Sequence, residues 1–297
     1  MQEKAGNPGR ICAIVVTYHP AADLEEKLGR LKPQVDEILV VDNTEGSAAL
    51  PLLCHLQERL GIRVVLNEKN LGIAAALNIG VRQALSRGYE WIATFDQDSM
   101  VTEGYFRTMF STYQSFPGCN QVALIAPLLC YSPEESAHRR DGQSMPKYTF
   151  TRTAMSSGSL VRAAVFRKEG FYEEAFFMDY VDYEFCLRLW KRGWKIIRAN
   201  HAHLLHRLGL PQTCSFAGFK ITIKSHNAWR RYYIMRNRIV VFRRYAFSSP
   251  AWCMYDFSWI FLELTKIILF EKEKLAQLRA TCRGLWHGLI GNMGAKP

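Results

Sequence analysis

The sequence predicts an α/β protein with a mostly parallel central sheet flanked by helices and a helical C-terminal extension. Over the first hundred residues, short apolar runs rich in β-branched side chains alternate with segments of helical spacing, which indicates βαβ units. The last hundred residues show helical spacing with many aromatic side chains. We therefore expect an α/β body over residues 1–210 and a helical, basic region over residues 211–297 that packs on the same domain.

Each element of the body follows from its own run of residues. Short apolar runs that stop at polar residues are typical of buried strands, and we expect strands over residues 11–17, 37–41, 62–66 and 91–95. Apolar side chains at helical spacing predict helices over residues 23–31, 48–60 and 73–87. In the less regular middle third we expect a strand over 122–126, a polar loop over 131–148, a turn at 156–159 that enters a strand, and a helix over 182–192.

The charge of the chain is concentrated in one stretch. The 297 residues carry a formal charge of +11, yet residues 201–250 contain nine basic and no acidic side chains while the first 200 residues are balanced. A basic stretch predicts contact with nucleic acid, an anionic membrane or a phosphorylated substrate. Because two thirds of the chain is neutral, a protein that coats nucleic acid is disfavoured.

Cysteine usage and hydropathy indicate a cytoplasmic protein. The eight cysteines form no C-x-x-C pair and most lie in apolar runs, which favours a reducing compartment over a zinc site or a disulfide framework. The polar N-terminus lacks the apolar segment of a signal peptide. The longest apolar stretch, residues 252–270, is interrupted by Asp256, Glu263 and Lys266, so we expect no membrane span.

Two carboxylates follow the fourth predicted strand. Asp96 and Asp98 are two residues apart, at the strand end where parallel sheets bind ligands. Two such groups repel each other unless a cation lies between them, and hard oxygen ligands suit Mg²⁺ or Mn²⁺ bound to a substrate phosphate. The alternative is a polar turn or a helix cap.

Polar residues also follow the first two predicted strands. Asp42, near Tyr18, could accept a hydrogen bond from a base or a ribose, although Asp42-Asn43 also fits an Asx-turn. Asn70 could cap the next helix, and Gly72 allows close approach to the backbone. The segment is neither a Walker loop nor G-x-G-x-x-G, which disfavours nicotinamide and P-loop chemistry.

Two further clusters come later in the chain. Asp182 precedes a predicted amphipathic helix, either as its N-cap or as a general base that accepts a hydroxyl proton. His201 and His203 should share a strand face that excludes His206. One histidine that joins the Asp96 and Asp98 cation is therefore favoured over a separate zinc site.

Taken in order, these residues resemble a known family. The chain is similar to family 2 inverting glycosyltransferases of the GT-A fold, in the subgroup that transfers L-rhamnose. The segments that carry the resemblance are VVTYHP (15–20), VDN (41–43), NEKNLGIAAALNIG (67–80), FDQDS (95–99), FMDYVDYEFCLRLWKRG (177–193), HRLG (206–209) and RRYYIMRN (230–237).

The resemblance implies a role for each matching position. It places the base and ribose of the nucleotide at Thr17, Tyr18 and Asp42, with Asn70, Gly72, Asn78, Asp96 and Gln97 also beside the nucleotide sugar. It makes Asp98, Asp96 and His206 the ligands of Mg²⁺ or Mn²⁺ and Asp182 the catalytic base. The family often has Glu-Asp at this motif, and Val181 here removes one carboxylate. Candidates near the acceptor or diphosphate are Asp179, Glu184, Arg207 and Arg236.

The resemblance also implies an activity. Residues 1–210 would bind the donor dTDP-β-L-rhamnose and transfer its sugar with inversion to a lipid-linked or core oligosaccharide of a bacterial lipopolysaccharide or O-antigen. The product would be an α-L-rhamnoside. Residues 211–297 would face this acceptor and the anionic cytoplasmic surface of the inner membrane. The alternatives are another nucleotide sugar, a sugar nucleotidyltransferase and, more distantly, a nucleic-acid-binding protein.

Overall fold

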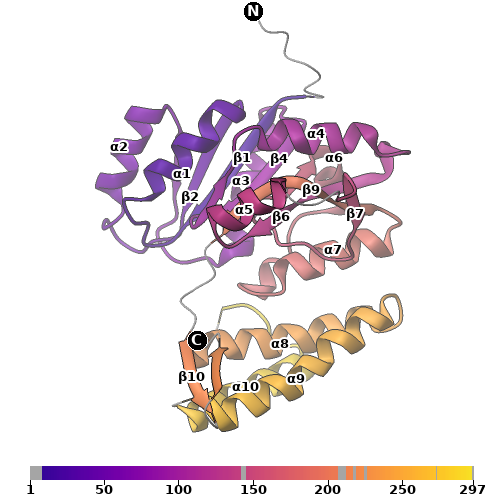
Figure 1. Cartoon of the computed structure of the whole chain (residues 1–297). Helices are drawn as coiled ribbons and strands as arrows, with labels where there is room; N and C mark the ends of the chain where they lie inside the picture. The colour runs from indigo at the N-terminus through magenta and orange to yellow at the C-terminus, as the bar shows by residue number, and fades with distance from the viewer. Residues whose placement is uncertain are drawn as a thin grey trace, which may run out of the picture.

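A nine-stranded sheet forms the centre of the molecule (Figure 1). This computed structural model describes residues 9–141, 145–206, 212–216, 219–223, 226–271 and 273–295. The strands lie in the order β3-β2-β1-β4-β8-β6-β9-β5, and β7 also pairs with β9. Strands β3, β2, β1, β4, β6 and β9 share one direction, while the short strands β5, β7 and β8 run against them. The predicted α/β class with a mostly parallel sheet is thus confirmed.

The strands of the central sheet are β1 (Ile11–Thr17), β2 (Glu37–Asp42), β3 (Arg63–Leu66), β4 (Trp91–Asp96), β5 (Ser99–Val101), β6 (Val122–Cys130), β7 (Tyr148–Phe150), β8 (Leu160–Arg162) and β9 (Lys195–His206). The helices around it are α1 (Leu24–Leu31), α2 (Leu50–Leu60), α3 (Ile73–Ser86), α4 (Tyr105–Ser115), α5 (Pro133–Asp141), α6 (Ala163–Glu169) and α7 (Val181–Lys191). The first four strands and three helices begin and end within two residues of their predicted bounds.

The two buried faces of strand β1 explain why residues 11–16 are all apolar. Cys12, Ile14 and Val16 pack on one side of the sheet in a core shared with α3 and α7. Ile11, Ala13 and Val15 pack on the other side with α1, α2 and α4. A parallel strand that is covered on both faces has no solvent side, so alternation of polar and apolar residues disappears.

The middle third departs from prediction at residues 131–148. Part of the expected loop is helix α5, which begins after a variant of the capping box in which Glu135 reaches the amide before Ser132. The Ser132 hydroxyl accepts from the Glu135 amide at 3.1 Å, and the Glu135 carboxylate accepts from the Tyr131 amide at 2.7 Å. The spacing Ser132-Pro133-x-Glu135 was the signal for this helix start, and the surrounding polar composition obscured it.

The C-terminal region is a layer of three helices below the body (Figure 1). It comprises α8 (Ala228–Tyr245), α9 (Pro250–Phe270) and α10 (Lys274–Ile290), preceded by an unpredicted hairpin of β10 (Gln212–Phe216) and β11 (Phe219–Ile223). Two glycines let α10 lie directly on α8, because a Cβ on Gly284 would meet the Tyr232 carbonyl at 2.5 Å and one on Gly288 the Arg236 carbonyl at 2.7 Å. None of the described helices combines the length and apolar character that a membrane span requires.

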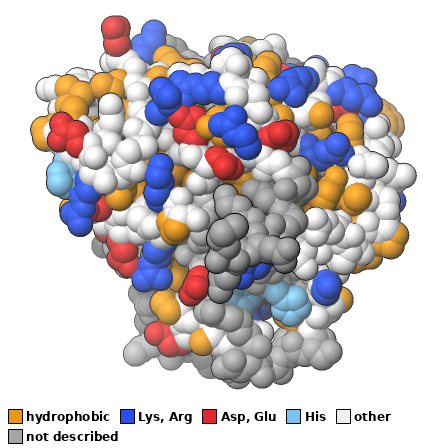
Figure 2. Space-filling view, turned by 90° about the horizontal axis from the view of Figure 1, so that it is seen from above, with side chains coloured by type: hydrophobic (Ala, Val, Ile, Leu, Met, Phe, Trp, Pro, Cys, Tyr) orange, Lys and Arg blue, Asp and Glu red, His pale blue; other side chains and the backbone are white. Residues whose placement is uncertain are grey.

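The arginines of α8 correct the expectation of an exposed basic surface. Arg231, Arg236 and Arg238 are at most 4% exposed. Arg238 forms ion pairs with Asp256 and Glu263, and Arg231 pairs with Glu263 as well. Much of the local positive charge is therefore neutralised inside the C-terminal layer. On the opposite side of the molecule, basic and acidic side chains are interspersed (Figure 2).

Candidate active site

Three strand ends meet at one edge of the sheet. In the parallel register Thr17 of β1 lies beside Asp42 of β2, and Val16 lies beside Asp96 of β4. The polar residues after these strands are therefore neighbours, as expected for the carboxyl edge of a parallel sheet. This edge carries most of the residues that sequence reasoning assigned to a nucleotide sugar.

Asp42 organises the first part of this edge. Its Oδ1 accepts from the Thr17 hydroxyl at 2.6 Å and from the Thr44 hydroxyl at 3.0 Å, and its Oδ2 accepts from the Thr44 amide at 3.1 Å. The last bond forms the Asx-turn that the sequence allowed. Asp42 is 2% exposed, so its contact with a nucleotide stays a prediction.

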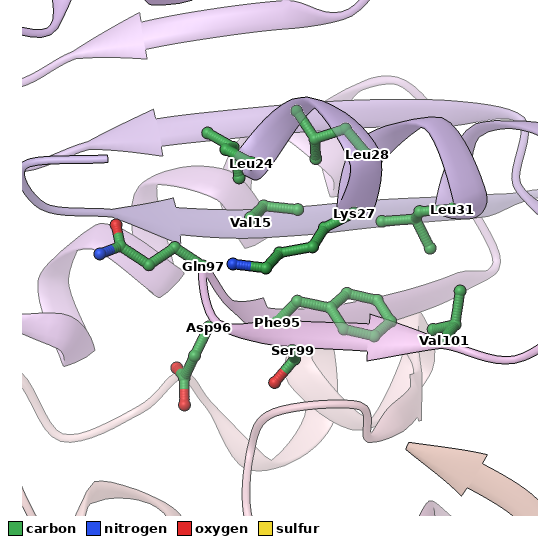
Figure 3. Close-up of a pocket in the computed structure, with 10 residues that line it drawn as sticks. All are labelled: Val15, Leu24, Lys27, Leu28, Leu31, Phe95, Asp96, Gln97, Ser99 and Val101. Carbon is green, nitrogen blue, oxygen red and sulfur yellow. The ribbon is translucent and has the colours of Figure 1, made fainter. Parts of the chain in front are cut away.

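Gln97 joins the ends of β1 and β4. Its carboxamide accepts from the Tyr18 amide at 2.8 Å and donates to the Tyr18 carbonyl at 3.1 Å. This leaves the Tyr18 ring 43% exposed at the rim of the edge. In Figure 3, Asp96 and Ser99 point away from the leucines of α1, while Gln97 points in another direction. The cavity beneath α1 in that view is only about 10 Å³, too small for a substrate.

Gly72 is required by a close backbone approach. Its φ is +83°, and a Cβ there would lie 2.4 Å from the carbonyl oxygen of Phe177. The Asn70 side chain accepts from the Gly72 amide at 2.9 Å, and the next amide, that of Ile73, donates to Phe177 O at 2.8 Å. The loop before α3 is therefore fixed to the segment before α7.

Asp96, Asp98 and His206 form a group that could hold a cation. One ligand atom from each lies within 4.8 Å of the others. Strand β5 pairs Ser99 with His206, whose Nδ1 is 2.9 Å from Ser99 Oγ and 3.4 Å from Asp98 Oδ1. Oδ1 of Asp98 is buried and has no hydrogen-bond partner among the described residues. Burial and the neighbouring Asp98 charge raise the pKa of Asp96 to about 6.

These features fit a divalent metal. Two crowded carboxylates and an imidazole, with one orphaned oxygen, are stabilised by a positive charge, and the donor set suits Mg²⁺ or Mn²⁺. The predicted arrangement of histidines was wrong in one respect. His201 is exposed whereas His203 is buried against Ser136, because a register shift near Pro127 and Leu128 interrupts the alternation of β9.

Asp182 lies in the first turn of α7 and faces a cleft. Its Oδ1 accepts from the Tyr183 amide at 2.9 Å, and Tyr180 rather than Asp182 occupies the N-cap position. Burial raises the pKa of the Asp182 carboxyl to about 7; the Tyr183 hydrogen bond opposes this rise, and the negative charges of Asp179 and Asp96 add to it. A carboxylate with a pKa near neutrality suits a general base.

The cleft lies between the body and the C-terminal layer and encloses about 710 Å³. The body contributes Asp96, Asp179 and Asp182, among others. From the other side α8 contributes Arg230, Ile234 and Arg238, and α9 contributes the aromatic and acidic residues Trp252, Tyr255, Asp256, Trp259 and Glu263. The guanidinium of Arg230 binds the Asp179 carboxylate through three contacts of 2.9–3.2 Å.

Sequence reasoning missed Arg230 and selected Arg236 from the same helix. Residues 230, 234 and 238 are four apart and share one helix face, whereas residue 236 is on another. Arg236 is 1% exposed and donates to the carbonyls of Phe176 and Gly294. The spacing of residues 230, 234 and 238 was the sequence signal that could have pointed to Arg230. The geometry does not support the prediction for Arg236.

Two more predictions lack support from the geometry. Glu184 is buried and bonded to Arg188 and Tyr245, away from the cleft lining. Asn78 is also buried, and its carboxamide donates to and accepts from the backbone of Tyr172. Both side chains are thus engaged in internal hydrogen bonds. Arg207, the remaining candidate, lies outside the described residues.

Comparison with known proteins identifies the family. The model of the family "Glycosyl transferase family 2" matches residues 12–167, more than half of the chain. The chain belongs to glycosyltransferase family 2. This membership confirms the family resemblance and the enzyme class drawn from the motifs.

Curated relatives extend over the whole chain. It is 29% identical to the dTDP-rhamnosyl transferase RfbF of Shigella flexneri, across 96% of this chain and 97% of that protein. It is 23% identical to the low-salt glycan biosynthesis hexosyltransferase Agl10 of Haloferax volcanii, across 96% and 92% respectively.

Solved structures show the same fold at low identity. A structure of GalNAc-T7 with UDP, GalNAc and Mn²⁺ has a TM-score of 0.61 and 10% identity, over 96% of this chain and 56% of that longer chain. A structure of residues 1–349 of TarS from S. aureus has a TM-score of 0.54 and 14% identity, over 94% and 80%. These likenesses support the predicted GT-A fold.

Proposed function

We propose that this glycosyltransferase moves L-rhamnose from dTDP-β-L-rhamnose to a saccharide hydroxyl and forms an α-L-rhamnoside. The main support for this reaction is that Asp182 and Asp96 line the same cleft. The donor is inferred from the extent of the likeness to the Shigella flexneri dTDP-rhamnosyl transferase. The other activities considered from the sequence, transfer of a different sugar and nucleotidyl transfer, predict different products.

The proposed reaction is a single displacement. Asp182 accepts the proton of the acceptor hydroxyl while the nucleoside diphosphate leaves from the opposite face of the sugar. Asp96, Asp98 and His206 would hold Mg²⁺ or Mn²⁺, and the cation would supply positive charge to the leaving diphosphate. Arg230 stands on the cleft wall opposite these carboxylates, and we assign it a supporting electrostatic role at the diphosphate in place of Arg236.

We further propose that the enzyme binds the anionic surface of a membrane through α9 and α10. The outer face of α9 exposes Met254, Phe261, Leu262 and Ile268 by 55–65%. Its acidic residues Asp256 and Glu263 turn inward to Arg238. Exposed Lys274, Arg279 and Arg283 on α10 supply positive charge beside the apolar face. This combination fits a lipid surface with anionic headgroups.

Such a placement supports an acceptor carried on a membrane lipid. Helix α9 forms part of the cleft wall with Trp252, Tyr255 and Trp259, and Tyr255 and Trp259 are also exposed. A saccharide in the cleft would therefore lie beside the lipid-facing helix. This supports a lipid-linked or core oligosaccharide on the cytoplasmic face of the inner membrane as acceptor.

The reaction is tested with a panel of nucleotide sugars in the presence of Mn²⁺, Mg²⁺ or EDTA. We expect cation-dependent release of dTDP from dTDP-β-L-rhamnose and an α-linked product by NMR. Turnover of another nucleotide sugar with none of dTDP-rhamnose would refute the donor. Release of pyrophosphate from a nucleoside triphosphate would indicate nucleotidyl transfer instead.

A further inference from the structure

The segment before α7 has an unusual backbone. Phe177, Asp179 and Tyr180 have φ values of +64°, +54° and +65°, although none is glycine. Phe177 is the centre of a three-residue γ-turn, in which the Met178 amide donates to the Phe176 carbonyl at 2.7 Å. A backbone of this kind persists only when its surroundings hold it. We call residues 176–180 the strained turn.

Asn237 of α8 holds this turn from below. Its side chain is fully buried, and Nδ2 lies 3.1 Å from the carbonyl oxygen of Phe176, 2.7 Å from that of Met178 and 2.9 Å from that of Asp179. Arg236 orients the carboxamide, because its Nε donates to Asn237 Oδ1 at 2.9 Å. The two hydrogens of a single NH2 group are therefore shared among three carbonyls of the strained turn.

The strained turn is also held from the other side. The Phe177 carbonyl accepts from the Ile73 amide at the start of α3, next to Gly72. Beyond the turn, the Glu184 amide donates to the Tyr180 carbonyl at 2.9 Å and starts α7. Asp182 lies within that first turn, so its position depends on the direction in which the strained turn enters the helix.

We propose that Asn237, oriented by Arg236, is a positioning residue that fixes the strained turn and thereby places the Asp182 carboxylate in the cleft. The inference rests on the proposed role of Asp182. It also gives a task to the Arg236-Asn237 pair, whose side chains are buried. Without the Nδ2 donor the three carbonyls lose their shared partner and the turn can relax.

The experiment compares Asn237→Asp with Asn200→Asp. Asp is isosteric with Asn, retains the acceptor for Arg236 and replaces the Nδ2 donor by an oxygen that the three carbonyls repel. Asn200 is an equally buried control, since it is 1% exposed and its hydrogen-bond partners lie in residues 146–149, with the Pro146 carbonyl at 2.9 Å. Both variants place a carboxylate against backbone carbonyls, so both lose stability.

Two readouts separate positioning from general destabilisation. In Asn237→Asp we expect faster amide hydrogen exchange across residues 176–184 and a decrease in kcat of about 100-fold, with the donor KM within about threefold of wild type. In Asn200→Asp we expect neither change for the folded protein. Should Asn237→Asp not fold, Asn237→Ala removes the same donor without adding charge and carries the same expectation.

The outcomes are distinct. Unchanged kcat per folded molecule in the Asn237 variant, or an equal loss in both variants, overturns the proposal. Hydrogen exchange does not depend on the identity of the donor, so wild type that turns over a different sugar refutes the proposed donor while the exchange comparison still decides the role of Asn237. Kinetics are then measured with the sugar that wild type transfers.

Discussion

The body and the C-terminal layer place polar and apolar residues in opposite ways. In the described residues 9–206, only four large hydrophobic side chains are exposed, whereas thirteen are exposed from residue 247 onward. The body buries apolar strands and presents carboxylates at their ends. The C-terminal layer buries the ion pairs of Arg231 and Arg238 and exposes the apolar side of α9. Large exposed apolar surfaces mark interaction sites, and this contrast supports the proposal that the C-terminal layer attaches the enzyme to a membrane while the body carries the chemistry.

The largest expected effect tests the chemical role of the body. Asp182→Asn keeps the shape of the side chain but removes the proposed base, so we expect kcat to decrease about 1000-fold. The Kd for dTDP, measured by calorimetry, should change by less than about threefold, since the substitution does not alter the sheet edge that is proposed to bind the nucleotide. Weakened dTDP binding with preserved turnover would contradict the assigned role.

The buried ion pairs of the C-terminal layer give the next effect. Arg238→Met leaves Asp256 and Glu263 without their shared partner, and we expect a loss of about 3–5 kcal/mol in the free energy of unfolding. Arg244→Met is the matched control, because Arg244 pairs with Glu173 at the surface and should contribute at most about 1 kcal/mol. Urea denaturation measures both. Equal losses of unfolding free energy in the two variants would show that the buried ion pairs stabilise the protein no more than the surface pair does.

The cation group of the body gives a smaller expected change. Asp98→Ala removes one of three proposed ligands, and we expect the Kd for Mn²⁺ to rise at least about tenfold, equal to about 1.4 kcal/mol. Glu26→Ala, which removes an exposed carboxylate of α1 paired with Arg30, should leave the titration unchanged. A Mn²⁺ titration followed by electron paramagnetic resonance distinguishes the two, and identical curves would argue against this metal site.

The pH profile tests the electrostatics of the same cleft. The raised pKa of Asp182 means that its basic form is lost as the pH falls through about 7, so kcat should decrease by about tenfold per pH unit on the acidic side. A cation beside Asp96 offsets one of the charges that raise this pKa, so the midpoint should lie at or below 7 with metal bound. A profile that stays flat from pH 8 down to the ordinary aspartate range near pH 4 would exclude this carboxylate as the base.

The smallest effect concerns attachment. Phe261→Glu places a charge on the outer face of α9, and we expect binding to vesicles of phosphatidylglycerol and phosphatidylcholine to weaken about tenfold. Phe150→Glu is the matched control in the body, since Phe150 is 56% and Phe261 65% exposed. Sedimentation with vesicles measures both variants. Equal vesicle binding by the two variants would show that the apolar face of α9 does not mediate membrane attachment. A change in oligomeric state in Phe261→Glu would indicate that this face binds a second copy of the chain.

Local sequence patterns are enough to predict the fold of the body. Apolar runs such as residues 11–17 and 37–42 are covered on both faces, so local composition and final environment agree. Polar residues after those strands had to meet at one edge, because parallel strands end together. Thr17, Asp42 and Asp96 are neighbours for that reason.

Which side of each C-terminal helix faces the cleft depends instead on long-range packing. The arginines of α8 look alike in the sequence, yet Arg230 lines the cleft, Arg236 supports the strained turn and Arg238 joins a buried ion pair. Their roles depend on the partners that packing brings from distant segments, such as Asp179 and Glu263. A net charge counts such residues equally, whereas the free energy of each charge depends on its burial and its partner.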